Sequence, residues 1–223
     1  MDSVLIHDMK NMGQRLGLLL SNLEEHYGDP EFKRSVAELL NATMEKMDTI
    51  VGRFSSHQDA VLIKVPLDLN GVLVEVMRRV KGRTPRAGVK VLNEPGEVPP
   101  VWGDPYYLRD AIGSVYQNAL EAAAAGGGTV TVRTGSFRQR RKPWAIVELA
   151  DDGSGMTQEF LRDRLFRPFQ TTKENGVGLG LYTARQIVQH HGGDIQVESR
   201  LGMGTTVRIL IPGATPSAAS PTV

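Results

Sequence analysis

The chain has 223 residues, of which 40% are hydrophobic, so it is long enough to bury a sizeable core in one or two domains. Its formal net charge of +1 argues against general nucleic-acid binding, and the absence of cysteine excludes disulfides and thiolate metal sites. No apolar run approaches the roughly 18 residues of a membrane span, and the N-terminus does not resemble a secretory signal. We expect a cytoplasmic segment without membrane contact of its own, although a longer protein that contains it could be anchored in a membrane.

Apolar residues repeat in alternating steps of three and four along residues 3–27 and again along residues 32–54, which predicts two helices. Between them, residues 28–30 supply a glycine suited to end a helix, an aspartate to cap the next and a proline to begin it. One such antiparallel hairpin buries too little apolar area to be stable alone. Residues 1–58 are therefore predicted to pair with a second copy in a homodimeric four-helix bundle.

From about residue 60 the hydrophobic period changes, and strands mixed with helices predict an α+β sandwich of two layers. A basic loop is expected at residues 138–143. The Pro/Ala/Ser-rich residues 213–223 are predicted to form a disordered tail, which leaves residues 59–212 as the second domain. The expected strands are 61–65, 89–94, 126–137, 143–153, 194–200 and 204–212, and the expected helices are 67–82, 104–125 and 179–191.

Three glycines alternate directly before the last predicted helix, at Gly176, Gly178 and Gly180. The start of a helix carries unpaired N–H donors and the positive end of the helix dipole, and together these bind phosphate. No Lys-Ser/Thr pair follows as in a P-loop, and the spacing is not that of a Rossmann motif. Taken alone, the pattern also fits a glycine-rich turn that binds nothing.

Two further stretches carry polar groups suited to a nucleotide. Asp151 ends a predicted strand and is followed by Gly153 and Gly155, so its carboxylate could accept the exocyclic amine of adenine while the glycines leave room for a flat base. Asn118 stands in the middle of a predicted helix, and its amide oxygen could ligate Mg²⁺. The alternatives are a simple glycine turn after a strand and an ordinary surface amide.

In this order and spacing, the stretches around Asn118 and Asp151, "LFRPFQTTK" and "GVGLGL" resemble the N, G1, F and G2 boxes of the histidine kinase ATP-binding domain. This is the Bergerat-type fold shared with gyrase, Hsp90 and MutL, and the resemblance covers about residues 60–212. It implies that Asp151 reads adenine, Asn118 is the ligand of Mg²⁺ and residues 166–176 form a mobile lid, although Phe166 and Phe169 could simply anchor a loop. The residues implied to bind ATP are Asn118, Asp151, Gly153, Gly155, Thr172, Lys173, Gly176, Gly178, Gly180, Leu181 and Thr205.

A dimerising hairpin followed by this domain resembles the catalytic core of a sensor histidine kinase, and more distantly the kinases of exopolysaccharide and PEP-CTERM protein-sorting systems. The resemblance implies autophosphorylation of His7 by ATP and transfer to an aspartate on a response regulator receiver domain. Asp8 matches the acidic residue that orients the histidine ring and accepts its proton. Asn11 lies one turn after His7, where a polar residue positions water for dephosphorylation of the regulator.

Two positions depart from the family pattern. Ser114 stands where many members carry Asn, His or Glu, which removes a ligand for Mg²⁺ or water. Glu121 stands where many carry lysine, which removes a cation that could meet phosphate. The alternative hypothesis is therefore a phosphotransfer or scaffold module with a degenerate ATP-binding domain.

Overall fold

The structure is a computed structural model that describes residues 13–14, 17–22, 28–55, 62–81, 88–124, 128–173 and 178–214. The chain divides into two compact units, residues 1–59 and residues 60–223. None of the helices within the described ranges combines the length and the apolar character that a membrane crossing requires.

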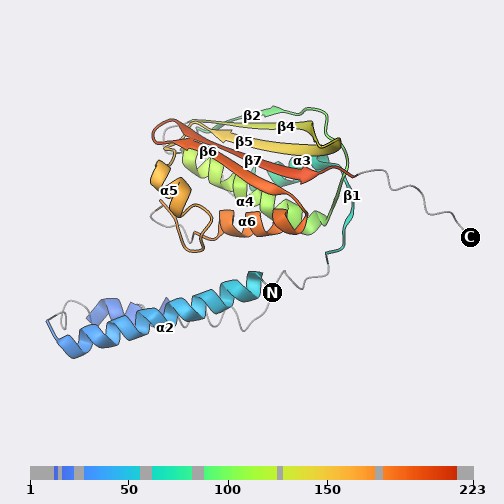
Figure 1. Cartoon of the computed structure of the whole chain (residues 1–223). Helices are drawn as coiled ribbons and strands as arrows, with labels where there is room; N and C mark the ends of the chain where they lie inside the picture. The colour runs from blue at the N-terminus through green and yellow to red at the C-terminus, as the bar shows by residue number, and fades with distance from the viewer. Residues whose placement is uncertain are drawn as a thin grey trace, which may run out of the picture. The chain divides into compact units, whose positions relative to one another are not determined.

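The first unit contains a long helix, α2, which spans Pro30–Ser55 as the heptad pattern predicts (Figure 1). Asp29 caps this helix as expected, because its Oδ1 accepts the backbone N–H of Glu31 at 2.8 Å. Residues 17–22, which precede the turn, are helical as well. These segments agree with the predicted hairpin as far as the structure describes it.

The two helical segments of the first unit border a hollow that Leu19 lines from the first segment. Leu20 belongs to the apolar repeat of residues 3–27, and it is 66% exposed within the single chain. Two helices cover only one stripe of each other, so the apolar side chains outside that stripe stay in contact with solvent. Among the described residues of this unit, the exposed large apolar side chains are Leu18, Leu20, Leu40 and Met44.

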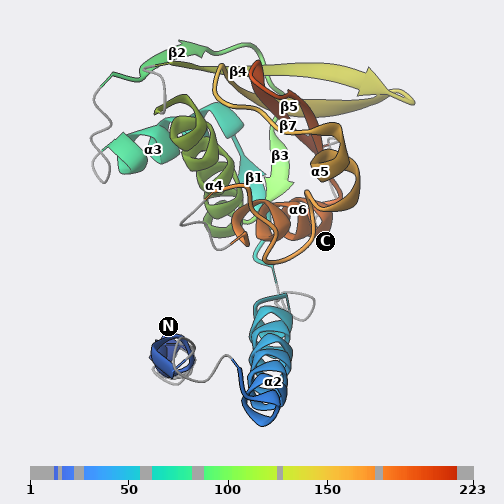
Figure 2. The same ribbon diagram turned by 90° about the vertical axis from the view of Figure 1, so that its left-hand side faces the viewer.

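Within its described residues, the second unit has the strands β1 (Val65–Leu67), β2 (Lys90–Glu94), β3 (Val101–Gly103), β4 (Thr129–Gln139), β5 (Lys142–Asp151), β6 (Asp194–Arg200) and β7 (Gly204–Pro212) and the helices α3 (Leu69–Lys81), α4 (Pro105–Ala124), α5 (Gln158–Asp163) and α6 (Gly180–His190). A five-stranded sheet has the order β2-β4-β5-β7-β6, in which β2 and β4 run parallel and the other neighbours antiparallel. The helices α3, α4 and α6 cover one face of this sheet (Figure 2). The predicted α+β sandwich is confirmed.

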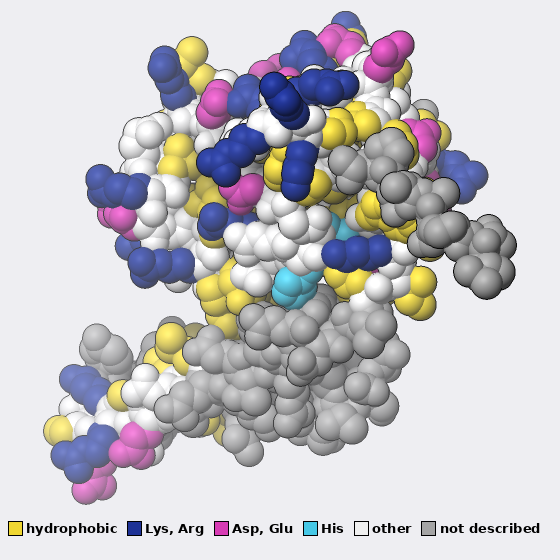
Figure 3. Space-filling view, turned by 45° about the vertical axis from the view of Figure 1, so that its right-hand side comes forward, with side chains coloured by type: hydrophobic (Ala, Val, Ile, Leu, Met, Phe, Trp, Pro, Cys, Tyr) yellow, Lys and Arg dark blue, Asp and Glu magenta, His cyan; other side chains and the backbone are white. Residues whose placement is uncertain are grey.

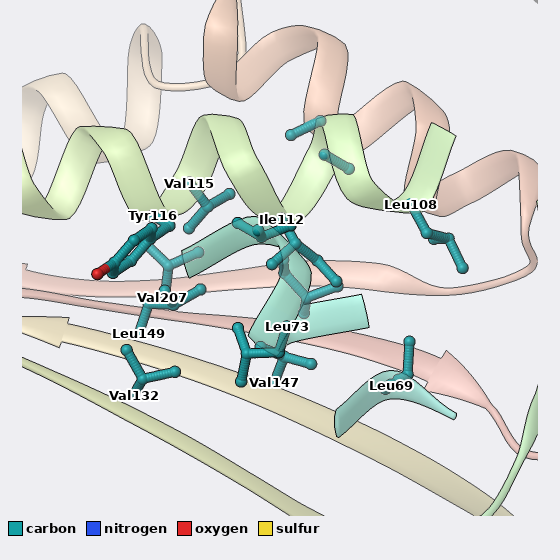
Figure 4. Close-up of a cluster of buried hydrophobic side chains, with 14 of the residues drawn as sticks. Leu69, Leu73, Leu108, Ile112, Val115, Tyr116, Val132, Val147, Leu149 and Val207 are labelled. Atoms are coloured by element: carbon teal, nitrogen blue, oxygen red, sulfur yellow. The ribbon is translucent and has the colours of Figure 1, made fainter. Parts of the chain in front are cut away.

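The core of the second unit lies between α4 and the sheet (Figure 4). Leu108 and Ile112 of α4 are fully buried, and Val147 and Leu149 of β5 are 0% and 1% exposed. Burial of each such side chain contributes about 1.5–3 kcal/mol relative to an exposed one. The helix is therefore held firmly over the sheet, which fixes the direction of the polar side chains on its other faces.

The start of α4 is closed by a hydrogen-bond network around Asp104, the cap that the sequence predicts. Its carboxylate accepts the backbone N–H of Tyr106 and that of Ile63, both at 3.0 Å. Its own N–H donates to Nε2 of His191 at 3.0 Å, and Nδ1 of the same ring lies 2.7 Å from the carbonyl of Ile187. Since Nε2 accepts a hydrogen bond, Nδ1 carries the ring proton and donates it to the carbonyl of Ile187. Burial lowers the pKa of His191, which favours the neutral ring.

The strand expected at residues 61–65 is wrong in position, because β1 begins at Val65. It pairs with β3, a three-residue strand that the sequence did not predict, in the register Val65 to Gly103. Ile63, which precedes β1, is 72% exposed, and its N–H donates to the carboxylate of Asp104 and not to a neighbouring strand. Local apolar character cannot place such a short strand, since its partner lies far along the chain.

The basic loop expected at residues 138–143 is much shorter in the structure. Strand β4 continues to Gln139, β5 begins at Lys142, and these two residues are paired. The turn consists of Arg140 and Arg141, with φ angles of 48° and 66°, as a two-residue hairpin turn with a left-handed backbone requires. On the face seen in Figure 3, Lys and Arg side chains are interspersed with Asp and Glu side chains.

The end of β7 is followed by two residues that are held in place. Gly213 donates its N–H to the carbonyl of Pro143 at 2.9 Å, and Ala214 donates to that of Pro100 at 2.6 Å. These contacts do not fit the predicted disordered tail at its first two residues. The rest of that tail, residues 215–223, lies outside the described residues.

Candidate functional site

A cavity of about 540 Å³ lies between α4, the start of α6, the end of β5, the start of β7, and residues 154–173, here called the connecting segment. Gly153 does not line this cavity, and Gly176 lies outside the described residues, as do His7, Asp8 and Asn11. The predicted site residues that do line it are Asn118, Asp151, Gly155, Thr172, Lys173, Gly178, Gly180, Leu181 and Thr205.

Asp151 lies at the end of β5, where the sheet register places it opposite Thr205 of β7. Its Oδ1 accepts the backbone N–H of Gly153 at 3.0 Å. Burial raises the pKa of the Asp151 carboxyl above its ordinary value, and hydrogen bonds from the backbone N–H groups of Gly153 and Thr205 partly oppose this rise. The cavity therefore contains a half-buried carboxyl group with acceptor capacity left for a ligand amine.

The hydroxyl of Thr205 is oriented by a neighbour. Ser199 Oγ donates to the carbonyl of Gly204 at 2.9 Å and accepts the N–H of Met156 at 2.9 Å. It also lies 2.9 Å from Thr205 Oγ1, which then acts as the donor to Ser199. This network holds β6, β7 and the connecting segment together beside Asp151.

Gly153 has a structural role in addition to the predicted one. A Cβ atom on Gly153 would collide with the backbone of Ala122, so glycine allows α4 to approach the loop after β5. Gly155 has a φ angle of 63° and lies against the backbone of Arg200, but it lines the cavity. Close packing against α4 requires a glycine at this position, and the role of Gly153 beside a flat base stays a prediction.

The start of α6 faces the cavity without a side-chain cap. Gly178 has a φ angle of 73°, and a Cβ atom there would lie 2.6 Å from the backbone of Gln170. A Cβ atom on Gly180 would lie 2.6 Å from Ser114 Oγ of α4. The small residues thus bring the uncapped helix end close to both α4 and the connecting segment, where its N–H groups and dipole favour an anion.

Asn118 and Glu121 of α4 both bind the ammonium group of Lys173. Lys173 Nζ donates to Asn118 Oδ1 at 2.9 Å and to Glu121 Oε2 at 2.6 Å. Amide and carboxylate oxygens are the ligands that Mg²⁺ prefers, so the atoms present here fit a hard cation. Glu121, regarded in the sequence only as a departure from the family pattern, therefore belongs to the site.

The connecting segment is attached to α6 by an aromatic anchor. Arg185 of α6 lies over the ring of Phe166, with 4.1 Å between the guanidinium carbon and the ring centroid, and Phe166 packs partly buried against the core. Phe169 has a φ angle of 61°, which is unusual for a residue other than glycine. The helix α5, which the sequence did not predict, begins after Thr157 and is capped by its hydroxyl.

The fold and the cavity define an ATPase-type sandwich with the Bergerat arrangement. Residues 103–215, more than half of the chain, match the family described as histidine kinase-, DNA gyrase B-, and HSP90-like ATPase, and the chain belongs to this family. The resemblance inferred from the four sequence boxes is thereby confirmed.

Curated relatives of the chain are bacterial kinases. Sporulation kinase E of Bacillus subtilis (strain 168) is 37% identical over 116 residues, which make up 52% of this chain and 15% of that kinase. Sporulation kinase C of the same organism is 23% identical over an alignment 222 residues long, which covers 93% of this chain and 47% of that kinase. The chain spans less than half the length of these relatives.

Solved structures show the same fold. The mycobacterial sensor histidine kinase MprB has a TM-score of 0.57 at 28% identity, covering 68% of this chain and 98% of that one. The histidine kinase ThkA, solved in complex with the response regulator protein TrrA, has a TM-score of 0.61 at 23% identity, covering 95% of this chain and 60% of that one.

The sequence predicted the polar residues that line the cavity better than the apolar ones. Met156, Leu165 and Val207 line the cavity and were not predicted, because nothing distinguishes them locally from other core residues. Glu121 could have been found, since it lies three residues after Asn118 and so on the same face of α4.

Proposed function

We propose that this chain is the core of a two-component sensor histidine kinase, which uses ATP to phosphorylate His7 and then transfers the phosphoryl group to an aspartate of a response regulator. The observation that carries the proposal is the cavity in which Asp151, Asn118 and the uncapped start of α6 meet. The supporting finding is that the chain belongs to the histidine kinase-like ATPase family.

The groups that line the cavity suit both the base and the phosphates of ATP. Asp151 supplies an acceptor for the adenine amine, and the apolar side chains of Met156, Leu165 and Val207 offer surfaces for the base. The start of α6 and Lys173 supply positive charge for the phosphates. Asn118 would hold Mg²⁺, which when bound would neutralise charge on the phosphates.

The proposed chemistry begins with attack of one imidazole nitrogen of His7 on the γ-phosphorus of ATP. The N–P bond forms as the bond to the oxygen bridging the β- and γ-phosphates breaks, and ADP leaves with that oxygen. Asp8, the next residue, would orient the ring and accept the proton of its other nitrogen. The aspartate carboxylate of the regulator then takes the phosphoryl group, and Asn11 would position water for its later hydrolysis.

We further propose that the first unit forms a homodimer. Leu18, Leu20 and Met44 are 67%, 66% and 62% exposed in the single chain. Burying such side chains between two hairpins would complete a four-helix bundle. The response regulator is proposed as a further partner because the related ThkA was solved bound to one.

The direct test is incubation of the dimeric protein with ATP labelled at the γ-phosphate. Wild-type protein should acquire acid-labile, base-stable label, and His7→Ala should abolish it. His26→Ala is the matched control, because it removes another histidine of the first 58 residues and should leave labelling intact. Label that survives in His7→Ala contradicts the assignment of the phosphoacceptor.

The alternative is a phosphotransfer or scaffold module with a degenerate ATP-binding domain, which Ser114 and Glu121 favour as departures from the family pattern. It predicts no measurable affinity for ATP. Calorimetric titration with Mg²⁺ and a non-hydrolysable ATP analogue separates the hypotheses, because the kinase should bind it in the micromolar to millimolar range.

A further inference from the structure

The ammonium group of Lys173 links the connecting segment to α4 across the cavity. Lys173, on the connecting segment, contacts Asn118 Oδ1 at 2.9 Å and Glu121 Oε2 at 2.6 Å. The side chains of Lys173 and Glu121 are 37% and 26% exposed, so water reaches the ion pair and the contact can be exchanged. The two oxygens thus point to one position that a single cation occupies.

The carboxylate of Glu121 is itself held in place. Its other oxygen, Oε1, accepts the side-chain N–H of Gln117 at 3.1 Å, one turn earlier on α4. Asn118 and Glu121 are three residues apart on the same helix, which keeps their oxygens close whether or not Lys173 is present. The pair is therefore preorganised to receive a cation.

We propose that Asn118 Oδ1 and Glu121 Oε2 form one cation seat, which Lys173 occupies in the free protein and a divalent metal ion occupies after exchange. This deepens the proposed function, on which it rests in part, because the metal would arrive with the nucleotide. Glu121 becomes a metal ligand beside Asn118, and water or phosphate oxygens fill the other positions of the ion.

Exchange follows from electrostatics. A divalent ion at this seat and the ammonium of Lys173 would lie within a few ångströms of each other and repel, so the lysine must leave when the metal enters. Lys173 belongs to the connecting segment, whose neighbouring residues Gln170, Thr171 and Thr172 also line the cavity. Expulsion of Lys173 therefore releases this segment from α4 and frees a positive charge for the phosphates.

The test uses the full chain without nucleotide and Mn²⁺ alone as the probe. Paramagnetic broadening of the Asn118 side-chain amide signals in NMR spectra measures occupation of the seat. The variants are Lys173→Met, which removes the competing ammonium, and Glu121→Gln, which removes the carboxylate. The controls are Lys142→Met and Glu97→Gln, which change exposed charges outside the cavity lining.

We expect Lys173→Met to strengthen Mn²⁺ binding by about 2- to 5-fold, the range that a partly exposed ion pair contributes. Glu121→Gln should weaken binding, and the gain from Lys173→Met should shrink in the Glu121→Gln background because the two residues act at one position. The controls should change neither quantity. Unchanged or weaker binding in Lys173→Met, unchanged binding in Glu121→Gln, or an undiminished gain in the double variant overturns the proposal.

A parallel calorimetric titration with ADP, with and without Mg²⁺, keeps the two proposals apart. If wild-type protein fails to bind nucleotide while the Mn²⁺ results agree with expectation, the proposed kinase function fails and the cation seat stands. If nucleotide binds while the Mn²⁺ results disagree, the seat fails and the proposed function stands.

Discussion

The two ends of α4 hold their polar groups in contrasting ways. At its start, the hydrogen bonds of Asp104 and His191 connect to the backbone of the scaffold, and both residues are buried. Toward its other end, Asn118 and Glu121 face a cavity and share the side chain of Lys173. Polar groups paired with backbone build the fold, whereas those paired with a replaceable side chain are available to a ligand.

The largest effect is expected at the cavity. Asp151→Asn replaces a carboxylate acceptor that would hydrogen bond to adenine, so affinity for an ATP analogue should fall by about 10- to 150-fold, the range for a hydrogen bond to a charged group. The free energy of unfolding at about pH 7 should not fall, because burial raises the pKa of Asp151 and its ionised form is costly in the folded protein.

Calorimetry and urea denaturation on the same samples check this prediction. Asp152→Asn is a partial control for charge, since Asp152 lies next to Asp151 but is not among the residues that line the cavity. If Asp151→Asn keeps its affinity for the ATP analogue, Asp151 is not the acceptor of the adenine amine.

At the start of α4, in contrast, we expect a loss of stability. Asp104→Ala removes the helix cap and leaves the N–H of Ile63 without its acceptor. The free energy of unfolding should fall by about 1–2 kcal/mol. Asp110→Ala, at an exposed position of the same helix, should change it by less than about 0.5 kcal/mol. Urea denaturation measures both, and equal effects of the two variants would contradict the capping role.

A smaller effect is expected from pH at His191. The unfolded chain binds a proton near the ordinary pKa of about 6.5, whereas burial lowers the pKa of His191 in the folded protein. Between these two values the unfolded state binds more protons, so this group lowers stability as pH falls below about 6.5. Above that range its contribution is constant.

Urea denaturation from about pH 7.5 to about pH 5 should show this slope in the wild type and a flatter one in His191→Gln. His190→Gln, a change at the adjacent residue, is the control and should keep the wild-type slope. Identical slopes in all three proteins would mean that burial does not lower the pKa of His191.

The smallest effect is expected on the solvent-exposed charges of the sheet. Arg208 contacts Glu148 at 2.7 Å and Glu198 at 2.6 Å, and its side chain is 30% exposed. Arg208→Met should lower the free energy of unfolding by less than about 1 kcal/mol, and added salt should reduce the difference. Nucleotide affinity should not change. A loss of affinity would show that the sheet charges influence the cavity.

Much of the fold was predictable because its signals are local. The caps Asp29 and Asp104 were identified from the residues around them, and β6 and β7 have the predicted bounds. The pairing of β1 with β3 was not predictable, because each strand is three residues long and is stabilised by a partner far along the chain. Helix α5 was not predicted either, because its six residues are too few to show a helical repeat of apolar residues.

The site shows the same division. Asp151, Asn118 and the glycines were predicted from motif order, and the structure places most of them around one cavity. The close approach of Ala122 to Gly153 was not predictable, because it depends on how α4 packs against the loop after β5. The assignments of His7, Asp8 and Asn11 stay predictions because these residues lie outside the described part of the chain.

The sequence by itself determined the family, the α+β class and the chemical character of the nucleotide cavity, because periodicity, caps and motif order depend on neighbouring residues. Only the tertiary structure decided which charges meet. Glu121 and Lys173 are 52 residues apart, and the contact that joins them exists because α4 and the connecting segment pack around the same cavity. The sequence does not show that two residues so far apart along the chain are in contact, because their contact forms only when α4 and the connecting segment pack together.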